Sequence, residues 1–329
     1  MSPDLRSICV LVPGKLHAHA VSRIGQTFRL ATLERIDPAL VSPELRDNVR
    51  AIAASPAIDA SLVGADFLRA LPHAEIVANF GVGYDGVDAA YAGKHGIMVT
   101  NTPDVLTEEV ADTALGLLIA TVRELPAAES WLRSGRWTRD GNYRLTPLTL
   151  RGRKVGIFGM GRIGLAIAHR LEAFGLPVAY HNRRRVEGLP YEYHATLKGL
   201  AEVVDTLVSV APGTASTEKA VDAEILKALG PDGVLVNIGR GSTVDEAALA
   251  AALKEGVIAA AGLDVFADEP NVPQALLDAP NTVLLPHVGS ASVHTRRAMA
   301  DLCVDNLVSW FTDRKALTPV PETAHVKAK

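Results

Sequence analysis

Short apolar runs recur through the first hundred residues of the chain, and stretches with helical spacing separate them. The runs lie at residues 8–12, 51–54, 76–80 and 97–99. Runs of this length, flanked by glycine and proline and alternating with helices, are typical of parallel strands in a layered structure. The pattern therefore predicts an α/β fold for this part of the chain.

A long helix is predicted over residues 107–125. Thr107 supplies a cap, two glutamates add negative charge to the first turn, and Pro126 stands just past the expected end. The following stretch, residues 129–153, is polar, contains tryptophan and is punctuated by glycine. We interpret it as a connection or an arm.

Apolar runs resume after residue 154, again with helical segments between most of them. Six strands are predicted, at residues 155–158, 178–180, 206–210, 234–238, 259–263 and 283–285. Six parallel strands with crossovers describe a doubly wound dinucleotide-binding domain. The chain then leaves this domain at His287 for a terminal helix over residues 292–311.

Length and composition restrict the class of protein. A chain of 329 residues is long enough for two domains, each with its own core. Its 48% hydrophobic and 21% charged residues are ordinary for a globular protein. A net charge of -4 offers no basic surface for nucleic acid or an anionic membrane, so small ligands are the expected partners.

Targeting and metal signals are also missing from the sequence. Cys9 and Cys303 have no partners at metal-binding spacing, which predicts buried, inert thiols and no metal site. The apolar run at 8–12 is too short for a signal peptide, and no run approaches the roughly 20 residues of a membrane span. A cytoplasmic enzyme is expected.

A glycine-rich turn follows the predicted strand at 155–158 directly. Gly159, Gly161 and Gly164 form the pattern GxGxxG, and a helical pattern begins immediately afterwards. The first glycine permits a tight turn, the second lets the backbone approach a pyrophosphate, and the third allows close helix packing. We expect this turn, with Arg162 and Ile163 at the helix start, to bind a nicotinamide dinucleotide through main-chain amides.

The end of the next strand indicates which dinucleotide is preferred. An NAD enzyme places an acidic residue there, whereas this chain has Asn182, Arg183, Arg184 and Arg185 after His181. Amide and guanidinium groups bind a ribose 2′-phosphate that a carboxylate would repel. One charge-assisted contact is worth roughly 1.5 to 3 kcal/mol, so one or two arginines predict about a 10-fold to 100-fold or larger preference for NADPH. The alternative is a solvated basic turn.

Four polar residues follow three successive strands of this predicted sheet: Arg240, Asp264, Glu269 and His287. Ligands of such sheets bind at the carboxyl ends of the strands, so these side chains are expected to converge. Reduction of a carbonyl requires polarisation of its oxygen, a proton donor and an anchor for the substrate. His287 is the candidate donor, with Glu269 keeping it protonated, and Arg240 is the candidate clamp.

Four segments together resemble the D-isomer-specific 2-hydroxyacid dehydrogenase family. They are Gly-Met-Gly-Arg-Ile-Gly at 159–164, Val-Asn-Ile-Gly-Arg-Gly at 236–241, Gly-Leu-Asp-Val-Phe-Ala-Asp-Glu-Pro at 262–270 and Leu-Pro-His-Val-Gly-Ser at 285–290. The resemblance runs from about residue 76 to residue 306, in the order and at the spacing of the family.

The resemblance implies roles for individual residues. Arg240 would bind and polarise the substrate, Glu269 would tune the histidine, and His287 would act as acid and base. Asp264 would contact the nicotinamide carboxamide. The shared motifs also place Ile238 among the cofactor-binding residues.

Further binding residues follow from the same resemblance. Gly289 is expected to contact the cofactor and Ser290 the substrate. The segment Asn-Phe-Gly-Val-Gly at 79–83 resembles the family loop whose amides, at Val82 and Gly83, hold the substrate carboxylate.

The resemblance also implies a domain organisation. Residues 1–101 and 290–329 would form a smaller, flavodoxin-like substrate domain, and residues 102–289 an inserted Rossmann domain that binds NADP, with the active site in the cleft between them. Opening and closing would gate water and ligand. Members of the family are usually homodimers through the long helix and the arm.

Within the family, Trp137 and the basic turn at 182–185 most resemble the NADPH-dependent glyoxylate/hydroxypyruvate reductases. The expected function is therefore reduction of small 2-oxo acids to D-2-hydroxy acids, with NADH as a weaker cofactor. A hydroxyphenylpyruvate or phenylpyruvate reductase of the same family is one alternative. A dinucleotide-sensing corepressor or scaffold is another, disfavoured by the presence of Arg240, Glu269 and His287.

Overall fold

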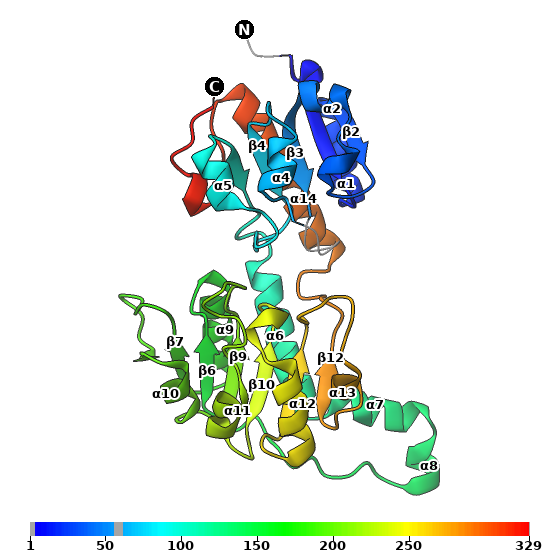
Figure 1. Ribbon diagram of the computed structural model, residues 1–329. Helices are drawn as coiled ribbons and strands as arrows, with labels where there is room; N and C mark the ends of the chain where they lie inside the picture. Colours follow the sequence, from blue (N-terminus) through cyan, green and yellow to red (C-terminus); the bar gives the residue numbers. More distant parts are fainter. Residues whose placement is uncertain (1–3, 56–61, 329) are drawn as a thin grey trace. The chain divides into compact units, whose positions relative to one another are not determined.

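The computed structural model describes residues 4–55 and 62–328 of the chain (Figure 1). The chain divides into two compact units. Unit 1 comprises Met1–Leu106 and Ser292–Lys329, and unit 2 comprises Thr107–Ala291. The boundaries expected at residues 101 and 289 lie a few residues before those of the structure.

Unit 1 contains a five-stranded sheet in the order β2-β1-β3-β4-β5, and every pair of neighbours is parallel. Its strands are β1 (Cys9–Pro13), β2 (Arg29–Leu33), β3 (Val49–Ala54), β4 (Ile76–Asn79) and β5 (Met98–Thr100). This is the flavodoxin-like doubly wound order. The predicted α/β class is confirmed, but β2 was missed because this edge strand carries exposed and half-exposed side chains rather than an apolar run.

The helices of unit 1 begin at recognisable caps; for example, Ser42 caps α2 and Asp88 caps α5. The elements are η1 (Leu5–Ser7), α1 (Ala18–Thr27), η2 (Pro38–Leu40), α2 (Pro43–Asn48), α4 (Ala65–Arg69), α5 (Ala89–Lys94), α14 (Val293–Thr312) and η4 (Pro321–Thr323). The terminal helix predicted over residues 292–311 is α14, with Ser292 as its N-cap.

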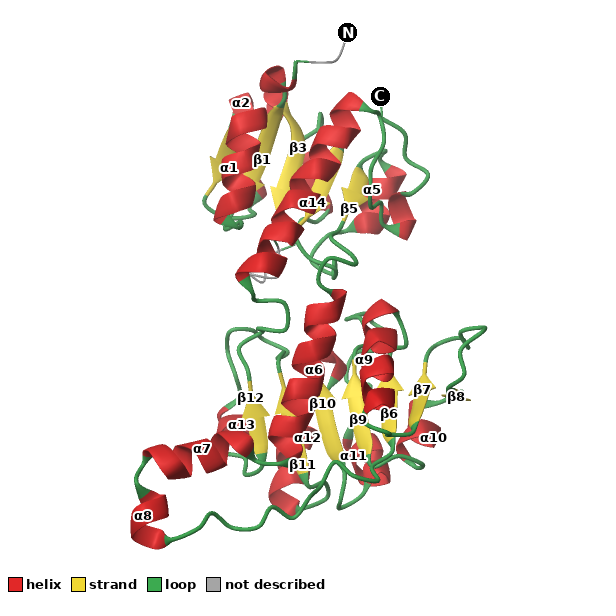
Figure 2. Cartoon of the chain, turned by 180° about the vertical axis from the view of Figure 1, so that it is seen from behind, coloured by secondary structure: helices red, strands yellow, loops and turns green. Residues whose placement is uncertain are grey.

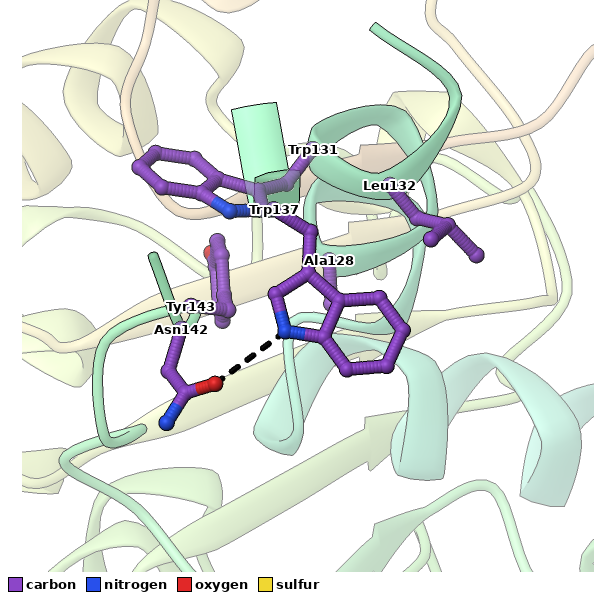
Figure 3. Close-up of a pocket in the computed structure, with 6 residues that line it drawn as sticks. All are labelled: Ala128, Trp131, Leu132, Trp137, Asn142 and Tyr143. Carbon is purple, nitrogen blue, oxygen red and sulfur yellow. Dashed lines mark hydrogen bonds between the residues drawn. The ribbon is translucent and has the colours of Figure 1, made fainter. Parts of the chain in front are cut away.

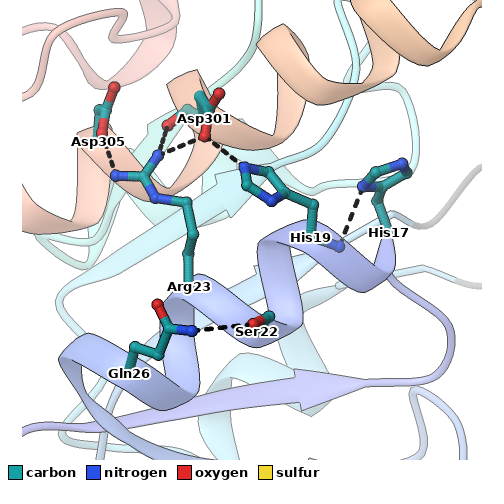
Figure 4. Close-up of polar contacts among 7 residues, drawn as sticks. All are labelled: His17, His19, Ser22, Arg23, Gln26, Asp301 and Asp305. Carbon is teal, nitrogen blue, oxygen red and sulfur yellow. Dashed lines mark hydrogen bonds and ion pairs between the residues drawn. The ribbon is translucent and has the colours of Figure 1, made fainter.

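The helices α1 and α14, far apart in the sequence, lie side by side within unit 1 (Figure 4). Arg23 of α1 donates hydrogen bonds of 2.8 Å to both Asp301 and Asp305 of α14. His19 Nε2 lies 2.7 Å from the same Asp301 carboxylate. The helix α14 begins just after the last residue of unit 2. These half-exposed ion pairs join it to α1, in the N-terminal part of the chain.

Unit 2 contains a seven-stranded parallel sheet in the order β12-β11-β10-β9-β6-β7-β8. Its strands are β6 (Val155–Phe158), β7 (Val178–His181), β8 (Glu192–His194), β9 (Thr206–Ser209), β10 (Val234–Asn237), β11 (Ala260–Leu263) and β12 (Thr282–Leu284). The order reverses between β6 and β9, as in a Rossmann fold. The predicted six strands are all present, and the seventh, β8, was missed because it is a short, polar edge strand.

Helices cover both faces of this sheet: α10, α11 and α12 lie on the face seen in Figure 1, and α6 and α9 on the face seen in Figure 2. The helices and turns are α6 (Thr107–Val122), α9 (Arg162–Ala173), α10 (Leu197–Ala201), α11 (Ala223–Leu229), η3 (Gly241–Thr243), α12 (Glu246–Glu255) and α13 (Gln274–Leu277). Leucines and isoleucines of α10, α11 and α12 form one apolar cluster with the sheet.

The predicted long helix and arm require a correction. The helix α6 ends at Val122 rather than residue 125, because Glu124 adopts a left-handed conformation with φ of 51°. Pro126 then stands in the first turn of a new helix, α7 (Leu125–Arg133), where its missing N–H costs nothing. The region interpreted as a connection or an arm, residues 129–153, thus includes most of α7 and all of α8 (Arg136–Asp140).

Two further expectations concern what the fold lacks. Among the described residues, every helix is too short or too polar to cross a membrane. In the same part of the chain, no group of three or more His, Cys, Asp or Glu side chains is arranged to hold a metal ion.

Candidate active site

The carboxyl ends of β10, β11 and β12 bring the predicted catalytic residues to one edge of the unit 2 sheet. Leu263 pairs with Asn237 of β10 on one side and with Leu284 of β12 on the other. Arg240 follows β10, Asp264 follows β11, and His287 follows β12. Adjacent parallel strands end at the same edge, and this places the three side chains on one side of the domain.

His287 and Glu269 are in direct contact. Nδ1 of His287 lies 2.7 Å from Oε2 of Glu269, and the other carboxylate oxygen accepts a 3.0 Å hydrogen bond from the Phe266 N–H. The His287 side chain is 37% exposed and the Glu269 side chain 26%. Within the described part of the chain, Nε2 of His287 has no hydrogen-bond partner, and it is therefore the ring nitrogen available to a ligand.

The backbone holds His287 in an unusual conformation. Its φ is 53°, in the left-handed region that few non-glycine residues adopt. The His287 N–H donates a 2.8 Å hydrogen bond to the Asp264 carbonyl, which fixes this turn to the end of β11. Strained conformations of this kind persist where the surrounding structure enforces them, commonly at functional sites.

The carboxyl groups of this edge differ in their electrostatics. Burial raises the pKa of Glu269, but the hydrogen bond and charge of His287, the Phe266 N–H and the charge of Arg240 outweigh burial, so the pKa lies below its ordinary value. Burial dominates at Asp264 and raises its pKa, despite hydrogen bonds from Val288 and Gly289. Glu269 is thus the carboxylate stabilised in its charged form beside the imidazole.

Asp264 organises the segment after β12. Its two carboxylate oxygens accept hydrogen bonds from the Val288 N–H at 2.7 Å and the Gly289 N–H at 2.8 Å. A Cβ on Gly289 would lie 2.9 Å from Asp264 Oδ2 and 3.4 Å from Cδ1 of Ile238, so the segment fits against both side chains only with glycine at this position. Ser290 follows it and is buried.

Arg240 is fixed through its main chain. Nδ2 of Asn237 donates a 2.9 Å hydrogen bond to the Arg240 carbonyl, and Oδ1 of Asn237 accepts one of 3.2 Å from the Gly239 N–H. A Cβ on Gly241 would overlap the main-chain carbonyl of Phe266, so only glycine allows this approach. Asn237 was not assigned a role from the sequence, because its contacts run to carbonyl and N–H groups a few residues away.

The glycine-rich turn leads into α9 as predicted. A Cβ on Gly159 would lie 2.8 Å from the Ala211 N atom, and one on Gly164 would overlap the Gly159 carbonyl. By contrast, no atom lies within 4 Å of the position of a Cβ on Gly161. The turn packs tightly against other main-chain atoms at Gly159 and Gly164. At Gly161 there is free space beside the turn, next to the first N–H groups of α9, which belong to Arg162 and Ile163. This geometry fits a bound pyrophosphate.

Asn182, at the end of β7, contacts this turn. Its Oδ1 accepts a 2.6 Å hydrogen bond from the Met160 N–H, and its Nδ2 donates one of 3.2 Å to the Met160 carbonyl. The following Arg183, Arg184 and Arg185 are exposed. In the described residues, their side chains make no hydrogen bond or ion pair. The three guanidinium groups are therefore available to an anion, whereas both polar atoms of the Asn182 side chain already have partners.

Val82 and Gly83 belong to unit 1, in the loop after β4. The structure thus brings together, on unit 2, Arg240, Asp264, Glu269 and His287, and places the predicted carboxylate-binding amides on unit 1.

A Rossmann sheet with an open glycine-rich turn and an arginine, a glutamate and a histidine along its carboxyl edge defines a dinucleotide-dependent oxidoreductase. Residues 115–289 match the family model described as D-isomer specific 2-hydroxyacid dehydrogenase, NAD binding domain. The chain belongs to this family.

Similar proteins agree with this membership. Glyoxylate/hydroxypyruvate reductase A of Arabidopsis thaliana is 48% identical over 319 residues, covering 96% of this chain and all of the relative. Hydroxyphenylpyruvate reductase of Plectranthus scutellarioides is 46% identical over 274 residues, covering 83% and 86% of the two chains. The crystal structure of the NADPH-dependent glyoxylate/hydroxypyruvate reductase of Sinorhizobium meliloti, in complex with NADP and malonate, is 60% identical, covers 98% and 99% of the two chains and has a TM-score of 0.94.

Proposed function

We propose that this protein is an NADPH-dependent glyoxylate/hydroxypyruvate reductase, which converts small 2-oxo acids to D-2-hydroxy acids. The observation that carries the proposal is the 2.7 Å contact between His287 and Glu269, at the same sheet edge as Arg240. The similarity to reductases of this activity at 48% and 60% identity supports it.

The site residues then have distinct tasks. Nε2 of His287 donates the proton that the carbonyl oxygen takes up, while Glu269 stabilises the protonated imidazole through Nδ1. The Arg240 guanidinium binds the substrate carboxylate and polarises the carbonyl oxygen. The N–H groups of Val82 and Gly83 bind the same carboxylate, and Ser290 is a further substrate contact.

The cofactor residues lie on unit 2. The amides of the turn from Gly159 to Gly164, including those of Arg162 and Ile163, hold the pyrophosphate. Asp264, Ile238 and Gly289 line the nicotinamide position. When bound, NADPH supplies the hydride for the carbonyl carbon.

The preference for NADPH rests on the turn after β7. Arg183 and Arg184 are exposed and bind the 2′-phosphate, and no carboxylate stands at the position where NAD enzymes bind the ribose. Asn182 is also part of the cofactor site. Its two hydrogen bonds to Met160 indicate that it acts by holding the glycine-rich turn in shape.

Steady-state kinetics with glyoxylate, hydroxypyruvate, pyruvate and phenylpyruvate, each with NADPH and NADH, test the proposal. We expect the highest kcat/KM with NADPH and either glyoxylate or hydroxypyruvate. A kcat/KM for NADH equal to that for NADPH would contradict the cofactor preference. Phenylpyruvate as the best substrate would instead favour a hydroxyphenylpyruvate reductase, the second candidate, which the 46% identical Plectranthus relative supports.

We also propose that the protein forms a homodimer through the arm that contains α7 and α8. These helices and the segment after α8 expose large apolar residues, among them Leu132 (53%) in α7, Trp137 (57%) in α8 and Leu145 (95%) in the segment after it. Figure 3 shows Trp137, whose indole N–H donates to Asn142, beside a pocket also lined by Trp131 and Tyr143. An apolar surface of this kind is typical of a protein interface, and a second copy of the chain is the proposed occupant.

Light scattering coupled to size exclusion checks the dimer. We expect twice the 34.8 kDa mass of the chain, and a lower mass for the variant Leu132→Asp. The cytoplasmic location expected from the sequence stays a prediction.

A further inference from the structure

The loop after β4 is held by its carbonyl groups. Nδ2 of Asn79, a residue only 2% exposed, donates hydrogen bonds of 3.1 Å to the Gly81 carbonyl and 2.9 Å to the Gly83 carbonyl. Nδ2 of Asn101 donates a 2.8 Å hydrogen bond to the Val82 carbonyl. Three successive carbonyl groups are thus bound by two asparagine side chains from the ends of neighbouring strands.

This arrangement determines the direction of the amide groups. A trans peptide is planar, so the N–H of each residue points opposite to the carbonyl of the residue before it. The Val82 N–H therefore points away from Asn79, and the Gly83 N–H away from Asn101. Within the described residues, neither N–H has an acceptor, so both are available to an anion.

The main chain at Gly81 completes the arrangement. Its φ is 153°, a conformation that side chains rarely allow, and its carbonyl also accepts a 2.9 Å hydrogen bond from the Thr102 N–H. A Cβ at this position would lie 3.3 Å from the Gly83 carbonyl oxygen and 3.6 Å from Nδ2 of Asn79. Glycine leaves room for one amide to bind both carbonyl groups.

We infer that Asn79 and Asn101 are positioning residues that hold the Val82 and Gly83 amides in the direction that binds the substrate carboxylate. The inference rests on the proposed function and deepens it, because it names the side chains that create the carboxylate site on unit 1. Neither asparagine touches the substrate. Each acts through a carbonyl group of the loop.

The sharpest variant is Asn79→Asp, which keeps the size of the side chain and removes its N–H donors. We expect the KM for glyoxylate to rise about 10-fold or more, with the Kd for NADPH within twofold of the wild-type value, because the cofactor residues lie on unit 2. The excess in KM over wild type should shrink at acidic pH, because a protonated carboxyl group regains one donor. Asn101→Asp should also raise the KM for glyoxylate and leave the Kd for NADPH unchanged, although only the Val82 carbonyl loses its donor.

Thr323→Val is the matched control. Thr323 is also fully buried in unit 1, and its hydroxyl exchanges two 3.1 Å hydrogen bonds with the Val99 main chain, away from the loop. This variant should lose stability without raising the KM for glyoxylate. A folded Asn79→Asp protein with a KM for glyoxylate within twofold of wild type overturns the inference.

Malonate binding separates this inference from the proposed function. Calorimetric titration of malonate into the NADP-bound wild type and variants reports on the carboxylate site without turnover. A 10-fold loss of malonate affinity in Asn79→Asp supports the inference even if the wild type fails to reduce glyoxylate or hydroxypyruvate, in which case only the proposed activity fails. Equal malonate affinity in wild type and variant, or absence of binding to the wild type, overturns it.

Discussion

Nδ1 of His287 lies 2.7 Å from Oε2 of Glu269, and this contact joins two turns separated by 18 positions in the chain. The contact also places the two nitrogens of the imidazole ring in different environments. Nδ1 contacts the carboxylate, whereas Nε2 has no hydrogen-bond partner among the described residues and is the proposed proton donor. Orientation of a histidine by a carboxylate is a recurrent way to set its tautomer and to stabilise its charged form.

Replacement of His287 by asparagine tests its role as proton donor. Asparagine tolerates the left-handed conformation of this residue, with its φ of 53°, so the fold is expected to persist. Loss of a general acid typically lowers the rate about 10²-fold to 10⁴-fold, and we expect kcat to fall by that amount. Fluorescence titration should show unchanged NADPH binding. Near-normal turnover would remove His287 from the mechanism.

The Glu269 carboxylate predicts a pH dependence of stability. Its pKa is lowered in the folded state, so its stabilising contribution is complete above the ordinary value of 4.5 and is lost as the pH falls through the folded-state pKa. The Tm of the wild type should therefore exceed that of Glu269→Gln at about pH 6, and the difference should shrink toward about pH 3.

Thermal melts of wild type, Glu269→Gln and Glu255→Gln across this range provide the measurement. Glu255 is an exposed carboxylate at the end of α12 and serves as the control. A Tm difference for Glu269→Gln that is constant with pH, or that grows as the pH falls, would show that the ionised carboxylate does not stabilise the fold.

The features that depend on a local sequence pattern could be predicted from the sequence. The turn at 159–164 and the residues at the ends of β10, β11 and β12 were predicted, because buried parallel strands appear as apolar runs and ligand residues follow them. The edge strands β2 and β8 were missed, since polar side chains on an edge interrupt such runs. Asn79 and Asn237 were missed as well. A side chain that binds loop carbonyl groups leaves no periodic signal, and its partners become visible only in three dimensions.

Arg183 and Arg184 predict a change in cofactor preference. In the double variant Arg183→Gln, Arg184→Gln, the kcat/KM for NADPH should fall about 10-fold to 100-fold or more, because even one charge-assisted hydrogen bond contributes roughly 1.5 to 3 kcal/mol. The kcat/KM for NADH, which lacks the 2′-phosphate, should stay within about twofold. Arg151→Gln, a change at another exposed arginine of unit 2, controls for the loss of positive charge. An equal loss with both cofactors would contradict the assignment.

Asn182 predicts a different pattern, because its side chain binds the Met160 main chain rather than projecting freely. Asn182→Ala should raise the KM for NADPH and NADH by similar factors, since both cofactors use the glycine-rich turn that Met160 belongs to. The loss of two hydrogen bonds, at about 1 kcal/mol each, corresponds to roughly a 10-fold to 30-fold effect. Kinetics with both cofactors provide the measurement. A loss confined to NADPH would instead assign Asn182 to the 2′-phosphate.

Gly241 predicts an effect on Arg240 through packing. A Cβ at this position overlaps the main-chain carbonyl of Phe266, so Gly241→Ala requires the two turns to separate. Overpacking of this kind costs about 1 to 3 kcal/mol, and the shift displaces the neighbouring Arg240 guanidinium. We expect a lower Tm together with a higher KM for glyoxylate.

Gly116→Ala is the matched control for this change, since Gly116 lies on the exposed side of α6 and no atom stands within 4 Å of its added Cβ. Alanine in a helix interior is favoured over glycine by about 0.5 to 1 kcal/mol, so this variant should melt at a higher temperature with its kinetics unchanged. A Gly241→Ala protein that keeps the wild-type Tm and KM would mean that the Phe266 turn moves freely. The position of Arg240 would then depend on Asn237 alone, through the hydrogen bond to the Arg240 carbonyl.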